Sequence, residues 1–171
     1  MANSHCIAIS EFTRRDILLE FGQKYQEKVD VVYNGNRNLN SGGADSQHLE
    51  SVPDRFVLYV GDRRVHKNLE YTIRVIQLAN SLHDKKIKLV IAGSPKPVSE
   101  QISQLISDDD SVIAVENVSD EALSALYEKC EALILLSRYE GFGLPVVEAA
   151  QRSKKVITLN SSALTEVCPP W

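Results

Sequence analysis

Short apolar runs alternate along this chain with longer stretches in which apolar residues recur every three or four positions. The apolar runs lie at 56–60, 87–92, 112–115, 132–136 and 156–159. Runs of four to six residues with almost no charge are typical of strands buried on both faces of a parallel sheet. The regular alternation of such strands with helical stretches therefore predicts an α/β fold with helices on both faces of the sheet.

The helices are expected between these strands, at 69–81, about 98–106, 120–129 and 145–152. The first helix has an inner face of apolar and small residues, namely Leu69, Thr72, Ile73, Ile76 and Ala79. Asn68 and Ser119 occupy positions where capping side chains are favoured. Pro145 begins the last helix, where a missing N–H group costs no hydrogen bond.

The amino-terminal part repeats this pattern on a smaller scale. A strand at 6–9 is followed by a helix capped by Ser10, and 29–33 reads as the next extended segment. The helix presents an apolar face, formed by Ile17, Leu18 and Phe21. This βα piece lacks a large sheet to pack on, so we expect exposed apolar surface and self-association.

Composition and charge narrow the class of protein. The chain has 171 residues, of which 43% are hydrophobic and 25% charged, as in ordinary soluble domains. Its net charge of −4 argues against nucleic acid as a partner. Cys6, Cys130 and Cys168 fit no zinc-binding spacing and indicate a reduced, cytoplasmic protein.

The segment from Glu140 to Glu148 carries the most chemical information. It joins the strand at 132–136 to a helix, and open α/β sheets bind ligands at such carboxyl ends of strands. Gly141 and Gly143 allow close backbone approach, and the helix start favours anions. The two carboxylates can accept hydrogen bonds from hydroxyls, so the segment suits a sugar linked to a diphosphate. Alternatively, both glutamates interact only with the helix dipole, and spacing alone leaves these two interpretations equal.

A basic loop follows the strand at 56–60. Gly61 ends this strand, and Arg63, Arg64 and Lys67 precede the next helix. Arginine can bind phosphate oxygens in a bidentate manner and lysine as a point charge, so the loop is a candidate anion site. The alternative is a solvated basic turn.

Four runs in this order resemble retaining glycosyltransferases with two Rossmann-like domains, the GT-B type, and within these the group 1, family 4-like enzymes. The runs are 59–69, 91–93, 118–127 and 137–148. The closest resemblance is to bacterial enzymes of surface polysaccharide biosynthesis. It implies that residues 55–171 form a truncated Rossmann-like nucleotide-sugar-binding domain, that 1–33 are the tail of an amino-terminal acceptor domain, and that 34–54 are a linker.

The resemblance also implies a role for each site residue. Glu140 would contact hydroxyls of the donor sugar, and Glu148 would accept from the ribose hydroxyls. Lys67 and one arginine would neutralise the diphosphate and the charge that develops on the leaving group. Arg63 and Arg64 are both candidates for this arginine, with a slight preference for Arg63.

Backbone groups are implied for the rest of the donor. The base would lie near Gly93 and Val118. Gly61 would also belong to the donor site, with Arg64 as the alternative cation. The sugar and phosphates would meet the glycine turn, formed by Gly141, Phe142, Gly143 and Leu144.

We therefore expect the donor-binding half of a hexosyl- or mannosyltransferase that uses a GDP- or UDP-linked sugar with retention of configuration. The donor is a substrate, so no cofactor and no metal are expected. A lipid-linked or saccharide acceptor would bind through the other domain, and the chain alone would be inactive. The longer protein would be cytoplasmic and peripheral at the inner membrane face. The alternative is a nucleotide-sugar-binding module without transferase activity.

Overall fold

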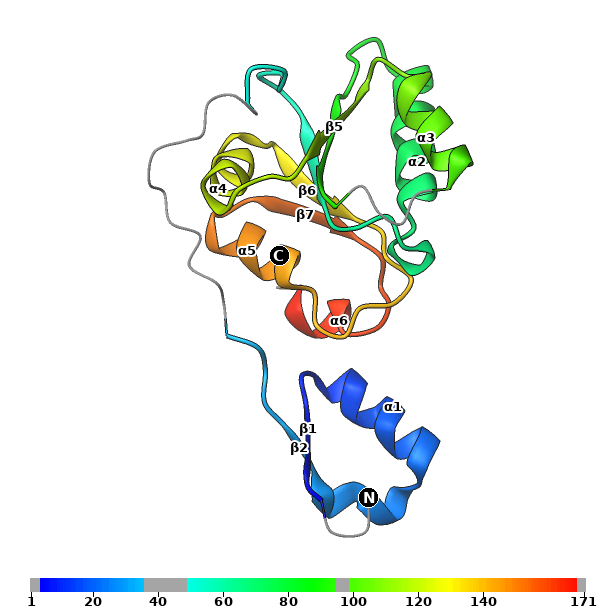
Figure 1. The fold of residues 1–171 in the computed structure, drawn as a ribbon, viewed down its shortest axis with the longest axis vertical. Coiled ribbons are helices and arrows are strands. Elements are labelled where there is room, and N and C mark those ends of the chain that lie inside the picture. Colours follow the sequence, from blue (N-terminus) through cyan, green and yellow to red (C-terminus); the bar gives the residue numbers. More distant parts are fainter. Residues whose placement is uncertain (1–3, 36–48, 95–98, 169–171) are drawn as a thin grey trace.

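The main body of the protein is a five-stranded parallel sheet. The computed structural model describes residues 4–35, 49–94 and 99–168 (Figure 1). The strand order is β5-β4-β3-β6-β7, and every neighbouring pair is parallel. The strands are β3 (Val57–Val60), β4 (Leu89–Gly93), β5 (Val112–Glu116), β6 (Ala132–Leu135) and β7 (Lys155–Thr158). The predicted Rossmann-like α/β fold is confirmed.

Helices cover both faces of this sheet. They are α2 (Leu69–Leu82), α3 (Glu100–Ser107), α4 (Asp120–Lys129) and α5 (Leu144–Gln151). From β3 the chain moves outward to β4 and β5, then returns to β6 and continues to β7 on the other side. Because parallel crossovers are right-handed, α2 and α3 lie on one face and α4 and α5 on the other (Figure 1). The strand order reverses between β3 and β6, and this switch point is where such sheets bind ligands.

The apolar runs of the sequence become the buried centre of the sheet. Leu58 and Tyr59 of β3, Leu89 of β4, and Leu133 and Leu135 of β6 have no exposed surface. The edge strand β7 alternates between exposed and half-buried positions. Continuous apolar runs therefore mark the central strands, as predicted, and the outer strand is more mixed.

The predicted helix caps are correct at Ser119 and wrong at Asn68. The Ser119 side chain accepts a hydrogen bond from the Ala122 N–H, as a capping residue does. Asn68 precedes α2 but makes no capping bond with its side chain. Its backbone is left-handed (φ 57°), and its amide nitrogen donates instead to the Leu136 carbonyl at 2.9 Å. Asn68 thus joins the loop after β3 to the end of β6. Of the predicted inner face of α2, only Ala79 is not fully buried.

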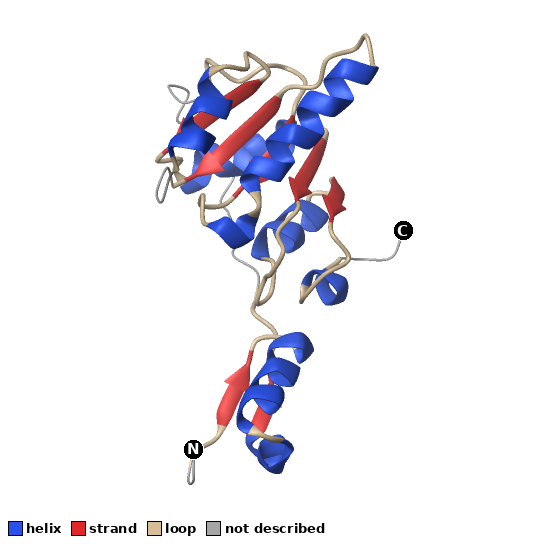
Figure 2. Ribbon diagram, turned by 90° about the vertical axis from the view of Figure 1, so that its right-hand side faces the viewer, coloured by secondary structure: helices blue, strands red, loops and turns tan. Residues whose placement is uncertain are grey.

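A smaller unit precedes the main sheet in the chain. Strands β1 (Cys6–Ala8) and β2 (Val29–Val31) pair in parallel and are connected by α1 (Glu11–Phe21) and the 3-10 helix η1 (Gln23–Lys28). Ala8, Leu18 and Val29 form its own buried cluster. The predicted cap at Ser10 is confirmed, since its hydroxyl accepts from the Thr13 N–H. Figures 1 and 2 show this unit apart from the five-stranded sheet.

Two further points concern segments outside these elements. Of the predicted linker at 34–54, residues 36–48 lie outside the part of the chain that the structure describes, as does Val98 at the expected start of α3. A four-residue helix, α6 (Leu164–Val167), follows β7 and was not predicted, because four residues show no helical periodicity. No helix within the described ranges is long and apolar enough to cross a membrane.

Candidate functional site

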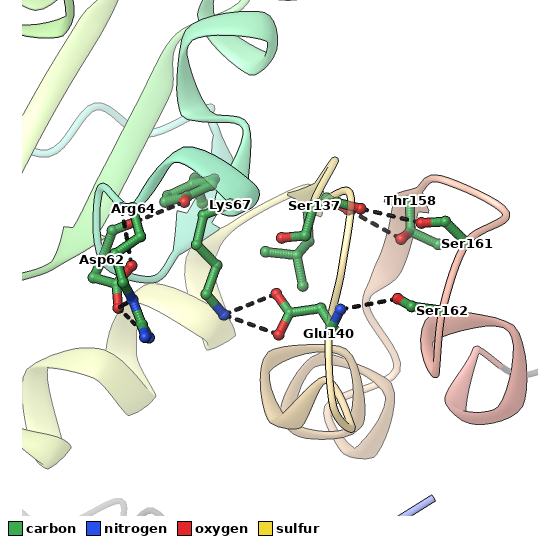
Figure 3. Close-up of polar contacts among 10 residues, drawn as sticks. Asp62, Arg64, Lys67, Ser137, Glu140, Thr158, Ser161 and Ser162 are labelled. Atoms are coloured by element: carbon green, nitrogen blue, oxygen red, sulfur yellow. Dashed lines mark hydrogen bonds and ion pairs between the residues drawn. The ribbon is translucent and has the colours of Figure 1, made fainter. Parts of the chain in front are cut away.

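An ion pair marks the switch point of the sheet. Lys67, on the loop after β3, places its Nζ atom 2.9 Å from both carboxylate oxygens of Glu140, on the loop after β6 (Figure 3). The Lys67 side chain is 15% exposed and the Glu140 side chain 9% exposed. Lys67 and Glu140, which the sequence analysis assigns to the site from two separate loops, are therefore in direct contact.

Backbone contacts fix the two loops against each other. The Arg138 N–H donates to the His66 carbonyl at 2.8 Å, and Asn68 donates to the Leu136 carbonyl. These bonds connect the loop after β3, through the two neighbours of Lys67, with the segment that follows β6. The pair is thus positioned by the scaffold as well as by its own charges.

The loop after β7 supports Glu140 from a third direction. The Glu140 N–H donates to the Ser162 hydroxyl at 2.9 Å (Figure 3). The Glu140 carbonyl accepts from the Ala163 N–H at 3.4 Å. The Ser161 hydroxyl donates to the Ser137 carbonyl at 3.1 Å. Sequence reasoning missed Ser162. A signal existed, because a run of small polar residues follows β7 at the same edge of the sheet.

The glycine turn leads into α5 as predicted. Gly143 has φ 101°, a left-handed conformation that favours glycine, and lies immediately before the helix. A Cβ atom at Gly143 would lie 2.8 Å from Cδ2 of the buried Leu164. Phe142 is buried with its ring 6.0 Å from that of Tyr33, whereas Leu144 is 37% exposed. The turn is therefore tightly packed on α6.

Glu148 is buried one turn into α5 and interacts with a different partner from Glu140. Its carboxylate accepts a hydrogen bond of 2.8 Å from the Tyr127 hydroxyl on α4. Burial and the nearby Glu148 charge raise the pKa of Tyr127, so this hydroxyl remains the donor. The Arg152 guanidinium lies over the Tyr127 ring at 5.4 Å. Sequence reasoning missed Tyr127 as the partner of Glu148.

The side chains of the two candidate arginines differ in exposure and in their acidic partners. The Arg64 side chain is 56% exposed and forms an ion pair of 2.6 Å with Asp62. Partial burial tends to raise the pKa of Asp62. The hydrogen bonds and the positive charge of Arg64 outweigh this effect, so the pKa of Asp62 is lowered. Arg63 is buried and contacts Glu116 of β5 at 2.9 Å, while its Nε atom has no hydrogen-bond partner among the described residues. Sequence reasoning missed Glu116.

The remaining residues predicted to bind the donor lie along the carboxyl edge of the sheet. Gly61 and Gly93 end the adjacent strands β3 and β4, and Val118 follows β5 and is half-buried. A Cβ atom at Gly93 would lie only 2.3 Å from the Gly61 carbonyl oxygen. Glycine is thus required where these two strands end.

Together these loops place cations, buried carboxylates and a helix start along one edge. An ammonium and a nearby exposed guanidinium favour phosphate oxygens, and carboxylates accept from hydroxyls. The arrangement can therefore bind a ligand that combines an anionic group with several hydroxyls.

Comparisons with known proteins agree with this arrangement. The family described as "Glycosyl transferases group 1" matches residues 44–171. The GDP-mannose:cellobiosyl-diphosphopolyprenol alpha-mannosyltransferase of Xanthomonas oryzae is 34% identical over 129 residues, which cover 71% of this chain and 34% of that protein. The serotype-specific mannosyltransferase WbdA of Escherichia coli is 26% identical, over 93% of this chain and 22% of that protein.

Solved structures show the same fold. HepE of Anabaena, in complex with UDP and glucose, matches with a TM-score of 0.74 and 19% identity, over 95% of this chain and 46% of HepE. WaaG, a glycosyltransferase involved in lipopolysaccharide biosynthesis, matches with a TM-score of 0.71 and 16% identity, over 94% of this chain and 46% of WaaG. The chain thus spans less than half the length of each of these four proteins. Since the family match covers most of its residues, the chain belongs to the glycosyl transferases of group 1.

Proposed function

We propose that this chain is the donor-binding half of a retaining glycosyltransferase that uses a nucleotide-diphosphate sugar. The Lys67–Glu140 contact at the switch point of the sheet is the observation that carries this proposal. This contact brings an ammonium group and a carboxylate together at 2.9 Å, which supports binding of a diphosphate next to the hydroxyls of a sugar.

Each residue then has a chemical role. Lys67 and one of the two arginines neutralise the diphosphate, and this becomes more important as the leaving group gains charge. Arg64 is accessible for this role, and Arg63 would have to exchange Glu116 for phosphate. Glu140 binds hydroxyls of the sugar. Glu148 binds the ribose hydroxyls as a hydrogen-bond acceptor.

The donor carries GDP or UDP, and GDP-mannose is favoured. The relative that is 34% identical is a GDP-mannose-dependent enzyme, and two of the relatives are mannosyltransferases by name. A UDP-linked donor is the alternative, in line with the UDP bound to HepE. Apart from this substrate, no cofactor is proposed.

The proposal extends to the longer protein. Residues 1–33 belong to an acceptor domain, 34–54 are the linker and 55–171 are the donor domain. The acceptor is a saccharide or lipid-linked saccharide of a bacterial surface polysaccharide, and the enzyme acts at the inner face of the membrane. The chain by itself binds the donor without transferring sugar. A binding module without any transferase activity is the second candidate, and the absence of transfer by the full-length protein would favour it.

Calorimetric titration of the chain with GDP and UDP tests whether it binds the nucleoside diphosphate part of the donor. We expect one of them to bind, and we expect Lys67→Gln to weaken this binding about tenfold or more and to flatten its salt dependence. Lys154→Gln is the control and should leave the affinity unchanged, because it removes a cation just before β7, at the edge of the sheet opposite the site. Binding of neither nucleotide, or equal losses in both variants, would reject the proposal.

A further inference from the structure

Glu166, on the short helix α6, binds the start of a helix that belongs to the other unit of the chain. Its carboxylate accepts hydrogen bonds from the N–H groups of Glu11 at 2.9 Å and Phe12 at 2.6 Å, the first two residues of α1. The first N–H groups of a helix have no partner within the helix, and its dipole favours a negative charge there. Ser10 serves the Thr13 N–H, so Glu166 completes the first turn of α1.

The same carboxylate contacts the end of the amino-terminal unit. The Tyr33 hydroxyl donates to Glu166 at 3.2 Å, and the Tyr33 ring packs against Phe142 of the glycine turn. Glu166 therefore binds the unit where α1 begins and where the chain leaves β2.

Helix α1 also lies directly against the loop that carries Glu140. The Thr13 hydroxyl donates to the Gly141 carbonyl at 3.2 Å, and the Tyr139 hydroxyl donates to Asp16 at 2.9 Å. The Phe12 ring meets the Tyr139 ring edge-on at 6.2 Å. The amino-terminal unit thus forms one side of the support for residues 139–143.

Helix α6 forms the other side of this support. Ser162 and Ala163, at its start, bond to the backbone of Glu140, and Leu164 packs against Gly143. The glycine turn, α6 and the start of α1 therefore contact one another pairwise. Glu166 makes the connection between α6 and α1.

We propose that Glu166 is a positioning residue of the donor site, which fixes α1 and α6 to each other and so holds residues 139–143 in the conformation that binds the donor. This role rests on the proposed function, and Glu166 acts through the residues that it holds in place. The inference rests on which atoms are bonded. A residue next to α1 in the chain could cap this helix, but the carboxylate that does so comes from a residue 155 positions away. Donor affinity should then depend on a hydrogen bond between the two units.

A proline substitution offers a matched test of this bond. Glu11→Pro removes the N–H group that donates to Glu166, and proline is well tolerated at the first position of a helix. Ser10 has φ −159° and ψ 160°, an extended conformation that a residue before proline prefers. Glu11→Ala keeps the N–H group and is the control for loss of the side chain.

The experiment measures nucleoside diphosphate affinity for the full chain carrying Glu166→Ala, Glu11→Pro, both changes, or Glu11→Ala. We expect Glu166→Ala to weaken binding about fivefold or more. Glu11→Pro should give part of this loss, and the double variant should lose no more than Glu166→Ala alone. Glu11→Ala should bind normally. Unchanged affinity in Glu166→Ala, or additive losses in the double variant, would overturn the proposal.

A second measurement separates this proposal from the proposed function. The backbone amide resonances of Gly141 and Gly143 report the conformation of the turn without any ligand. If the unsubstituted chain binds neither GDP nor UDP, the proposed function fails, and these resonances decide the role of Glu166. Shifts in both Glu166→Ala and Glu11→Pro, absent in Glu11→Ala, support positioning, and unshifted resonances overturn it.

Discussion

Lys67 and Glu140 neutralise each other at the carboxyl edge of the sheet, where both are largely buried. Removing a buried charge from water is costly, so such a pair contributes little net stability, but loss of one partner leaves the other charge uncompensated. The exposed pair of Arg64 and Asp62 beside it lacks this penalty. The two neighbouring ion pairs should therefore respond differently to substitution.

The first prediction follows from this difference. Lys67→Met alone should lower the free energy of unfolding by about 1–3 kcal/mol, because Glu140 is left without its partner. Lys67→Met combined with Glu140→Gln should recover much of this loss. Arg64→Met is the matched control and should change stability by less than about 1 kcal/mol. Urea unfolding measures all three, and equal effects of Lys67→Met and Arg64→Met would contradict the account.

At the scale of the elements, local sequence pattern predicts most strands and helices correctly. Buried parallel strands require continuous apolar runs, and the runs at 56–60 and 132–136 became β3 and β6. The cap at Asn68 is wrong because its side chain binds the Leu136 carbonyl just after β6, a contact that depends on strand order. The partners Ser162 for Glu140 and Glu116 for Arg63 were missed for the same reason. The periodicity of apolar residues predicts which positions are buried, but it does not predict which strand ends become neighbours.

The second prediction concerns the ends of β3 and β4. Gly93→Ala would place a Cβ atom 2.3 Å from the Gly61 carbonyl oxygen. The Gly61 backbone cannot move aside easily, because its N–H group donates to the Ala92 carbonyl at 3.0 Å. Gly22→Ala is a matched control, because Gly22 also has a positive φ, 105°, but no atom within 4 Å of a Cβ. We expect Gly93→Ala to cost about 1–3 kcal/mol more than Gly22→Ala in thermal or urea unfolding. Equal losses of stability in the two variants would show that the close approach of Gly93 to Gly61 does not determine the cost of the substitution.

At the scale of the whole molecule, the reversal of strand order between β3 and β6 brings the predicted loops together. The sequence placed Lys67 and Glu140 on loops at the same edge of a sheet, and the switch point makes those loops adjacent. The amino-terminal unit also has the strand–helix–strand order that its apolar pattern predicts. Its hydrogen bonds to Glu166 on α6 could not be predicted, because they join residues more than 150 positions apart.

The third prediction concerns association of whole chains. The amino-terminal unit exposes several large apolar side chains, and Leu19 of α1 is 68% exposed. We expect the average mass in sedimentation experiments to rise with protein concentration, because exposed apolar surface tends to find a partner. Leu19→Lys should suppress this rise, and Leu78→Lys, at a 60% exposed position on α2, should not. A chain that remains monomeric at every concentration would refute this expectation.

Calorimetry with Glu140→Gln and Glu148→Gln tests most directly the claim that this edge binds a nucleotide-diphosphate sugar. Glu140→Gln should weaken the nucleotide sugar about tenfold or more, through the loss of a charged hydrogen bond, and should spare the nucleoside diphosphate. Glu148→Gln should weaken both, and should affect ribonucleotides more than their 2′-deoxy analogues. Equal losses for every ligand, or no loss in either variant, would contradict the account.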